Sequence, residues 1–196
     1  SLIGSTVSDM VGNGGVTAPF KRLWVPHFNA GELRAYNAAT IARDVDGMPD
    51  VVVQLPAGAK PNAVAFDATD NLWVTDNAGN RLLKYTPMQL AVSGQPTPSI
   101  TINTNGTSLQ SPIGLVFDAT GNLWVASATR LEFYLPTDLD ESGPTTPTRV
   151  LIAEGSDIPA GLTFDSAGNL WLTSASFTMA RNSVMAFAPS DLVAGG

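Results

Sequence analysis

The sequence predicts an all-β fold, a β-propeller of four-stranded blades of about 50 residues, with four blades in this chain. Three observations lead to this prediction. One turn motif occurs three times, the four tryptophans lie about 50 residues apart, and short apolar runs alternate with turns rich in Gly, Pro and Asn. Tandem units of this length, each with room for four short strands, are typical of propeller blades.

The turn motif reads FDATDNLW at 66–73, FDATGNLW at 117–124 and FDSAGNLW at 164–171. An Asp at its start can accept backbone N–H groups, and the Gly or Asp and the Asn near its end tolerate positive φ. The motif therefore predicts a tight hairpin between two strands. One Asp at the same place in every copy favours a structural role over a catalytic or metal-binding one. These residues are Asp67, Asp118 and Asp165.

The strands after the turn are apolar on both faces, because Leu72, Trp73 and Val74 follow one another without a polar residue. Strands of this kind must be covered on both sides, as they are when sheets stack face to face. We therefore expect the tryptophans to be buried between neighbouring blades rather than to stack on a cofactor. They are Trp24, Trp73, Trp124 and Trp171.

The repeats indicate a single domain over residues 1–196, with blades at about 16–55, 62–102, 113–152 and 160–187. In blade one the innermost strand is expected to be shortened or displaced, because Trp24 follows Pro19 by only five positions, whereas the Trp of each other repeat follows its Pro by twelve. The linkers after the third strands of blades two and three predict one helical turn each, at 88–90 and 138–139. Residues 189–196 are predicted to be a tail.

The fourth repeat ends without an outermost strand of its own, and segment 1–7 has the character of one. The N-terminal strand is therefore predicted to complete blade four and close the ring, which removes an exposed sheet edge. The number of repeats leaves three arrangements open. The chain could form a closed four-bladed monomer, half of an eight-bladed ring in a homodimer, or part of a longer propeller.

Composition excludes several classes of function. The net charge is −7, with 17 acidic and 10 basic residues, which argues against a nucleic acid or an anionic membrane as partner. No apolar run approaches the ~18 residues of a membrane span, so no membrane insertion is expected. The absence of cysteine excludes disulfides and thiolate chemistry. The low charge and the Thr-, Asn- and Gly-rich turns predict an extracellular, cell-surface or periplasmic protein.

The pattern PxGLxFDxxGNLWVA, followed by a run such as NRLLKY, resembles the NHL-repeat β-propellers that are common among bacterial exported proteins. The resemblance covers blades two to four well and blade one in part. It implies the architecture and leaves the function open, because this fold serves binders, scaffolds and enzymes. More distantly, the chain resembles propellers of the gluconolactonase and streptogramin-lyase types, which are enzymes.

The resemblance to those enzymes implies catalytic residues that the chain supplies only in part. Gluconolactonase-like enzymes hold a divalent metal partly through an Asn in a PNG segment, and Asn62 matches that Asn. The same position in the next two blades holds Ile113 and Ala160, which cannot bind a metal. Lyase chemistry uses a histidine with a metal, and His27 is the single histidine. We therefore predict no catalytic residue, no metal and no cofactor.

In a propeller, the loops between second and third strands share a face with the loops that enter the innermost strands, and ligands usually bind there. The candidate ligand-binding residues on this face are His27, Asn62, Asp76, Asn77, Arg130, Phe177, Met179 and Arg181. The longest of these loops lies in blade four, and its mixture of Phe, Met and Arg is typical of protein interfaces.

The sequence thus favours a non-enzymatic binding or scaffolding propeller that recognises a protein, a peptide or a glycan. The alternative is a metal-assisted lactonase or lyase with a degenerate site near Asn62, Asp76 and His27.

Overall fold

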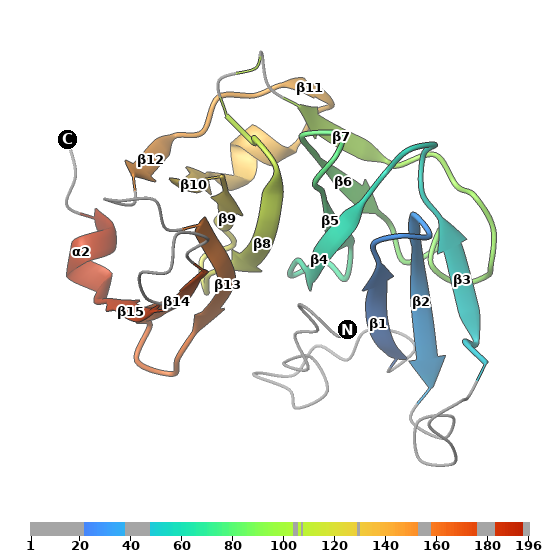
Figure 1. The fold of residues 1–196 in the computed structure, drawn as a ribbon, viewed down its shortest axis with the longest axis horizontal. Helices are drawn as coiled ribbons and strands as arrows, with labels where there is room; N and C mark the ends of the chain where they lie inside the picture. The colour runs from blue at the N-terminus through green and yellow to red at the C-terminus, as the bar shows by residue number, and fades with distance from the viewer. Residues whose placement is uncertain are drawn as a thin grey trace.

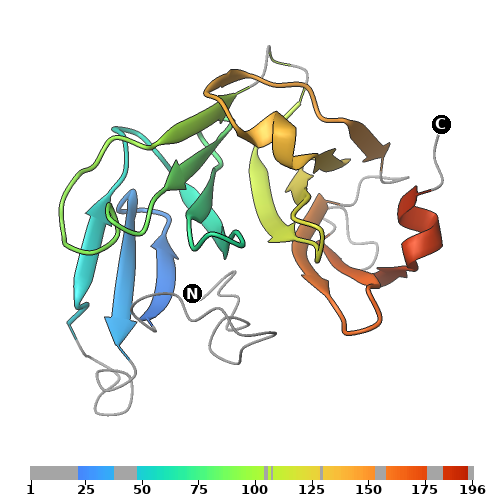
Figure 2. The same ribbon diagram turned by 180° about the vertical axis from the view of Figure 1, so that it is seen from behind.

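The computed structural model describes residues 22–37, 48–103, 106, 108–128, 130–152, 158–175 and 183–193. Within these ranges the chain forms four sheets, one after another in sequence, which stand side by side in an arc (Figure 1). The view from behind shows the same arc, with the first and last sheets at its two ends (Figure 2). The prediction of an all-β fold is confirmed.

Within the described residues, fifteen strands form the four sheets. Sheet one contains β1 (Arg22–His27), β2 (Glu32–Asn37) and β3 (Val51–Gln54). Sheet two contains β4 (Pro61–Phe66), β5 (Leu72–Asp76), β6 (Arg81–Tyr85), β7 (Ile100–Asn103) and the added strand β11 (Gly143–Pro144). Sheet three contains β8 (Pro112–Phe117), β9 (Leu123–Ser127), β10 (Arg130–Tyr134) and β12 (Arg149–Ile152). Sheet four contains β13 (Ile158–Phe164), β14 (Leu170–Ala175) and β15 (Ser183–Phe187).

Strands pair antiparallel within each sheet, except that β11 runs parallel to β7. The innermost strand of blade one and the closing strand at 1–7 lie outside the described residues. Closure of the ring and the number of blades in it therefore stay predictions.

The repeated Asp organises each hairpin turn as expected. Asp67 Oδ1 accepts the N–H groups of Thr69 at 2.9 Å and Asn71 at 3.0 Å, and its Oδ2 accepts the indole N–H of Trp73 at 3.0 Å. Asp118 and Asp165 repeat these contacts. One Asp thus holds the turn and the tryptophan of its own sheet together, which is a structural role.

These aspartates predict a loss of stability in acid. Burial raises the pKa of Asp67, but hydrogen bonds from Asn71, Trp73 and Thr69 outweigh it and hold the pKa below its ordinary value of 3.8. Hydrogen bonds from Trp171 and Asn169 lower the pKa of Asp165 to about 2. A lowered folded-state pKa stabilises the fold above the unfolded-state value, and this stability is lost as the pH falls through the folded-state value.

The free energy of unfolding, measured in urea, should therefore fall as the pH is lowered from about 4 towards 2. The slope should be shallower in Asp67→Asn and unchanged in Asp140→Asn, an exposed residue of a surface loop. Equal slopes in all three proteins would contradict the assignment.

The core lies between the sheets and forms three apolar clusters. Trp24 packs against sheet two, Trp73 against sheet three and Trp124 against sheet four, and these rings are 7%, 1% and 2% exposed. The expected burial between sheets is confirmed for these three. It is wrong for Trp171, which is 41% exposed, because its face of sheet four points away from sheet three.

The linker between the third and fourth strands of sheet two covers the outer edge of sheet one. The corresponding linker of sheet three covers the outer edge of sheet two. In the first, Val52 donates its N–H to Ser93 Oγ at 3.0 Å and accepts the N–H of Gly94 at 3.0 Å. In the second, the N–H of Thr101 is donated to Ser142 Oγ at 3.0 Å, and β11 extends sheet two beside β7. Each Ser-Gly pair thus protects an edge strand that would otherwise offer free backbone groups.

A helical turn comes before each Ser-Gly pair, as predicted for 88–90 and 138–139. Leu90 donates its N–H to Thr86 O at 3.2 Å, and the second turn is the 3-10 helix η2 (Pro136–Leu139). The prediction of a tail after Pro189 is wrong, since helix α2 (Pro189–Val193) occupies the equivalent place in sheet four. The leucines Leu90, Leu139 and Leu192 are buried. The sequence therefore contains three copies of a Pro-x-x-Leu motif, at 87–90, 136–139 and 189–192, and only the first two led to a predicted helical turn.

Candidate functional site

The two predicted groups of loops do share one face. The buried carboxylate of Asp76, at the end of β5, accepts the N–H of Lys60 at 2.8 Å, and Asn77 donates its N–H to Lys60 O at 2.9 Å. In sheet three, Ser127 Oγ donates to Gln110 O at 3.0 Å. The loop between the second and third strands is thus tied to the segment that enters the innermost strand.

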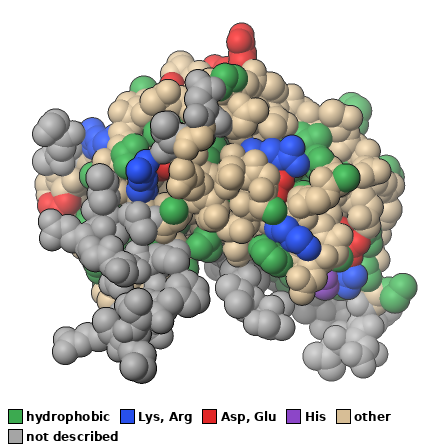
Figure 3. Space-filling view, turned by 45° about the horizontal axis from the view of Figure 1, so that its top comes forward, with side chains coloured by type: hydrophobic (Ala, Val, Ile, Leu, Met, Phe, Trp, Pro, Cys, Tyr) green, Lys and Arg blue, Asp and Glu red, His purple; other side chains and the backbone are tan. Residues whose placement is uncertain are grey.

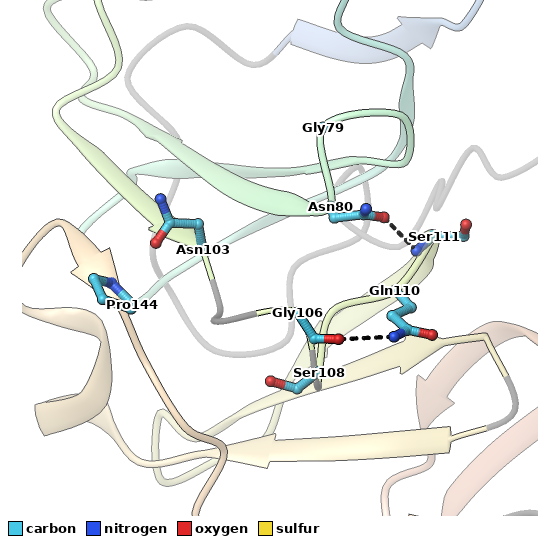
Figure 4. Close-up of a pocket in the computed structure, with 8 residues that line it drawn as sticks. All are labelled: Gly79, Asn80, Asn103, Gly106, Ser108, Gln110, Ser111 and Pro144. Carbon is cyan, nitrogen blue, oxygen red and sulfur yellow. Dashed lines mark hydrogen bonds between the residues drawn. The ribbon is translucent and has the colours of Figure 1, made fainter.

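A cavity of about 670 Å³ lies on this face where sheets two and three meet (Figure 4). Its lining comes from the loop between β5 and β6, the end of β7, the segment before β8, and β11. These residues are Gly79, Asn80, Asn103, Gly106, Ser108, Gln110, Ser111 and Pro144. The cavity therefore offers side-chain amides and hydroxyls, and none of these lining residues is charged.

The backbone around this cavity is strained. Five non-glycine residues in the described part of the chain have left-handed φ, and three of them lie here: Asn80 at 50°, Leu109 at 51° and Ser111 at 47°. Leucine is unfavourable in this conformation by roughly 1–2 kcal/mol because its Cβ crowds the backbone. Such residues persist where the surroundings hold them, and they concentrate at functional sites.

Hydrogen bonds across the cavity wall hold these conformations. Ser111 donates its N–H to Asn80 Oδ1 at 2.8 Å, which joins sheet three to the loop of sheet two. Gln110 Nε2 donates to Gly106 O at 2.9 Å, and both bonds are visible in Figure 4. The N–H of Leu109 is donated to both carboxylate oxygens of Glu132, at 3.0 and 3.1 Å. These hydrogen bonds fix the shape of the cavity wall.

Glu132 is the buried anchor beneath the cavity. It lies in the middle of β10, is 0% exposed, and accepts the hydroxyl of Tyr134 at 2.8 Å. Burial raises the pKa of Glu132, and the hydrogen bonds from Tyr134 and Leu109 offset this only in part. The side chain of Arg130 lies near enough to favour the ionised form.

Sheet two has no such anchor. Leu83 occupies the register of Glu132, since both pair with the residue after their sheet's tryptophan. Among the described residues, the buried hydroxyl of Tyr85 has no hydrogen-bond partner there. The sequence contained a signal for Glu132, an acid inside the apolar run RLEFY where the preceding repeat has RLLKY.

Two of the residues predicted to bind ligand, Asp76 and Asn77, make hydrogen bonds within the protein that hold the loops beside the cavity. Asp76 is 0% exposed, and its carboxylate also accepts Gly79 N–H at 3.1 Å and Arg81 Nε at 2.8 Å, so it positions the loop that lines the cavity. Asn77 Nδ2 donates to Pro112 O at 3.4 Å and joins sheets two and three.

The other predicted residues do not line the cavity or lie outside the described residues. His27 ends β1, Asn62 lies in β4, and Arg130 begins β10. None of the three is among the residues that line the cavity. The predicted residues of the blade-four loop, Phe177, Met179 and Arg181, are outside the described residues.

Within the described ranges, no three His, Asp or Glu side chains are grouped so that they could hold an ion. Asp76, the acid of the alternative site, already accepts three hydrogen bonds.

In the face shown in Figure 3, Lys and Arg side chains form separate spots rather than a basic patch. No helix among the described residues is long and apolar enough to span a membrane.

No protein-family model matches this chain, and no curated protein matches its sequence. Solved structures with a similar fold include a streptogramin B lyase, at 14% identity and a TM-score of 0.58, covering 95% of this chain and 53% of that one. A gluconolactonase-like protein has 18% identity and a TM-score of 0.58, covering 87% and 58%. An extracellular domain from B. thetaiotaomicron, whose protein is described as resembling a one-component system, has 14% identity and a TM-score of 0.58, covering 86% of this chain and 22% of that one.

At these identities the likeness concerns the fold alone. It supports a distant resemblance to propeller-type proteins, and assignment to the NHL type stays a prediction. The chain spans about half the length of the streptogramin B lyase that it resembles.

Proposed function

We propose that this chain binds an uncharged glycan in the cavity between sheets two and three and that it does so without catalysis. The observation that carries the proposal is the left-handed conformation of Asn80 and Ser111, which line the cavity, and of the buried Leu109, which lies between the lining residues Ser108 and Gln110. Unfavourable backbone conformations gathered at one place, one of them held by a buried acid, indicate a selected geometry.

The chemistry of the lining favours a sugar. Side-chain amides both donate and accept hydrogen bonds, and serine hydroxyls do the same. The hydroxyls of a glycan match such a mixture, whereas an anionic or cationic ligand would need an opposite charge that the described lining residues lack. An exported location fits this role, and one similar structure is an extracellular domain.

Asn103 provides the sharpest test. Its side chain is exposed at the end of β7, so its loss should leave the fold intact. In a titration of neutral oligosaccharides followed by NMR or calorimetry, Asn103→Ala should weaken binding about fivefold, the effect of one hydrogen bond of about 1 kcal/mol. Gln54→Ala is the matched control, because Gln54 has the same register in sheet one.

The two variants separate the possible outcomes. Equal weakening by both, or no binding of any neutral glycan by the wild-type chain, would contradict the proposal. Binding of a peptide that is weakened by Asn103→Ala alone would keep the site and change the class of ligand.

The second candidate function is a metal-assisted lactonase or lyase, which is favoured by the similar structures that bear those names. A whole propeller could combine Asn62 and His27 with residues from sheets beyond this chain. Turnover of a lactone panel that is abolished by EDTA and by Asn62→Ala would support it. Turnover that survives EDTA would not.

A further inference from the structure

The interface between neighbouring sheets repeats three times with the same parts. The tryptophan of one sheet packs on the next sheet, beside the phenylalanine that precedes the turn Asp. The rings of Trp73 and Phe117 are 6.3 Å apart, edge to face, and those of Trp124 and Phe164 are 6.4 Å apart in the same arrangement. Each sheet therefore has a face that gives a tryptophan and an opposite face that receives one.

Sheet four presents the giving face to solvent. Val184 has the register of Leu82 and Leu131, since each of the three pairs with the residue two after its sheet's tryptophan. Leu82 and Leu131 are 0% and 4% exposed, but Val184 is 65% exposed. Thr173 and Ala186, on the same face, are also exposed.

The complementary face belongs to sheet one. The receiving face of each later sheet begins with two apolar residues around its tryptophan, such as Leu72 and Val74 in sheet two. Sheet one has Leu23 and Val25 at these positions, and both are only half-buried. Tyr36, at the register of Tyr85 in sheet two, is also half-buried.

Geometry argues that the two faces meet between chains. Sheets one and four stand at opposite ends of the arc in both views (Figures 1 and 2). One end carries a giving face without a receiver and the other a receiving face that is only half-buried, so a second copy of the chain can supply a partner for each end. The two ends of one arc would then contact the two ends of the other through two identical interfaces.

We propose that the free face of sheet four, formed by Trp171, Thr173, Val184 and Ala186, docks sheet one of a second copy of this chain. Three interfaces of the same design already exist within the chain, and the docking would add the missing receiver for Trp171. This inference is independent of the proposed ligand site.

Sedimentation equilibrium of the 196-residue chain tests it. The wild type should have twice the mass of the chain, and Val184→Arg should halve that mass while circular dichroism stays unchanged. The matched control is Val92→Arg, since Val92 is a 69% exposed valine in a linker of sheet two, and it should keep the doubled mass. A wild type that stays monomeric would overturn the proposal, even if sheets one and four of the same chain contacted each other. A dimer that survives Val184→Arg would overturn it as well.

Cross-linking provides a second measurement that does not depend on disrupting the interface. The chain has no cysteine, so single cysteines can be placed at Val184 and at Val25 in separate proteins. A short bismaleimide should join the two variants when they are mixed and should join neither variant to itself. Self-joining of Val184→Cys, or no joining in the mixture, would overturn the head-to-tail arrangement.

Discussion

Trp73→Ala is expected to lower the free energy of unfolding by about 3–5 kcal/mol, the range for truncating a buried tryptophan. The ring is 1% exposed and packs in the cluster that joins sheets two and three. Its loss leaves a cavity that the rigid strands on either side cannot fill. Urea unfolding followed by circular dichroism measures the change.

Trp171→Ala is the matched comparison, because both indoles donate to the Asp of their own turn, at 3.0 Å for Trp73 and 2.9 Å for Trp171. The two substitutions therefore remove the same hydrogen bond and differ in packing. At a concentration where the chain sediments as a monomer, Trp171→Ala should cost less than half as much as Trp73→Ala. Equal costs would mean that packing between sheets does not carry the stability.

Glu132→Leu is expected to cost about 1–3 kcal/mol and to weaken ligand binding more than tenfold. Sheet two has a leucine, Leu83, at the register of Glu132, so we expect a leucine side chain to fit at this position of β10. The cost arises because the N–H of Leu109 and the hydroxyl of Tyr134 lose their acceptor in a buried place. Without that acceptor, the left-handed conformation of Leu109 is no longer held.

Two further variants identify the cause. Tyr134→Phe in the Glu132→Leu background should recover part of the stability, since it removes one of the two orphaned donors, but should not restore binding. Burial raises the pKa of Glu132 above 4.5, so its contribution to stability is complete below that pH and is lost as the pH rises through the raised value. Glu132→Gln should lack this dependence. Normal binding by Glu132→Leu would contradict the anchoring role.

Features that depend on local sequence could be predicted. The Asp, the Gly or Asp at positive φ, and the apolar runs on either side act within a few residues, so the motif predicts the first hairpin in each of sheets two to four, and the structure has it. The helical turns before the Ser-Gly pairs are local as well. The helix α2 was missed because its motif lacks the Ser of the other two copies.

Features that depend on neighbouring sheets could not be predicted. The exposure of Trp171 follows from where the next sheet stands, and its sequence is almost identical to that around Trp124. The cavity is formed by segments that are far apart in the chain, and left-handed Leu109 has no sequence signature. None of the predicted candidate residues is among the described residues that line the cavity, because its lining comes from segments that only the packing of two sheets brings together.

The central claim is that the ligand site is the strained cavity between sheets two and three. Amide NMR spectra of the isotopically labelled chain, recorded with and without a neutral oligosaccharide, test it most directly. We expect the signals of Asn80, Gln110 and Ser111 to shift and those of His27 and Asn62 to stay in place. Shifts at His27 and Asn62 that require a divalent cation, with none around the cavity, would contradict the account and favour the metal-assisted alternative.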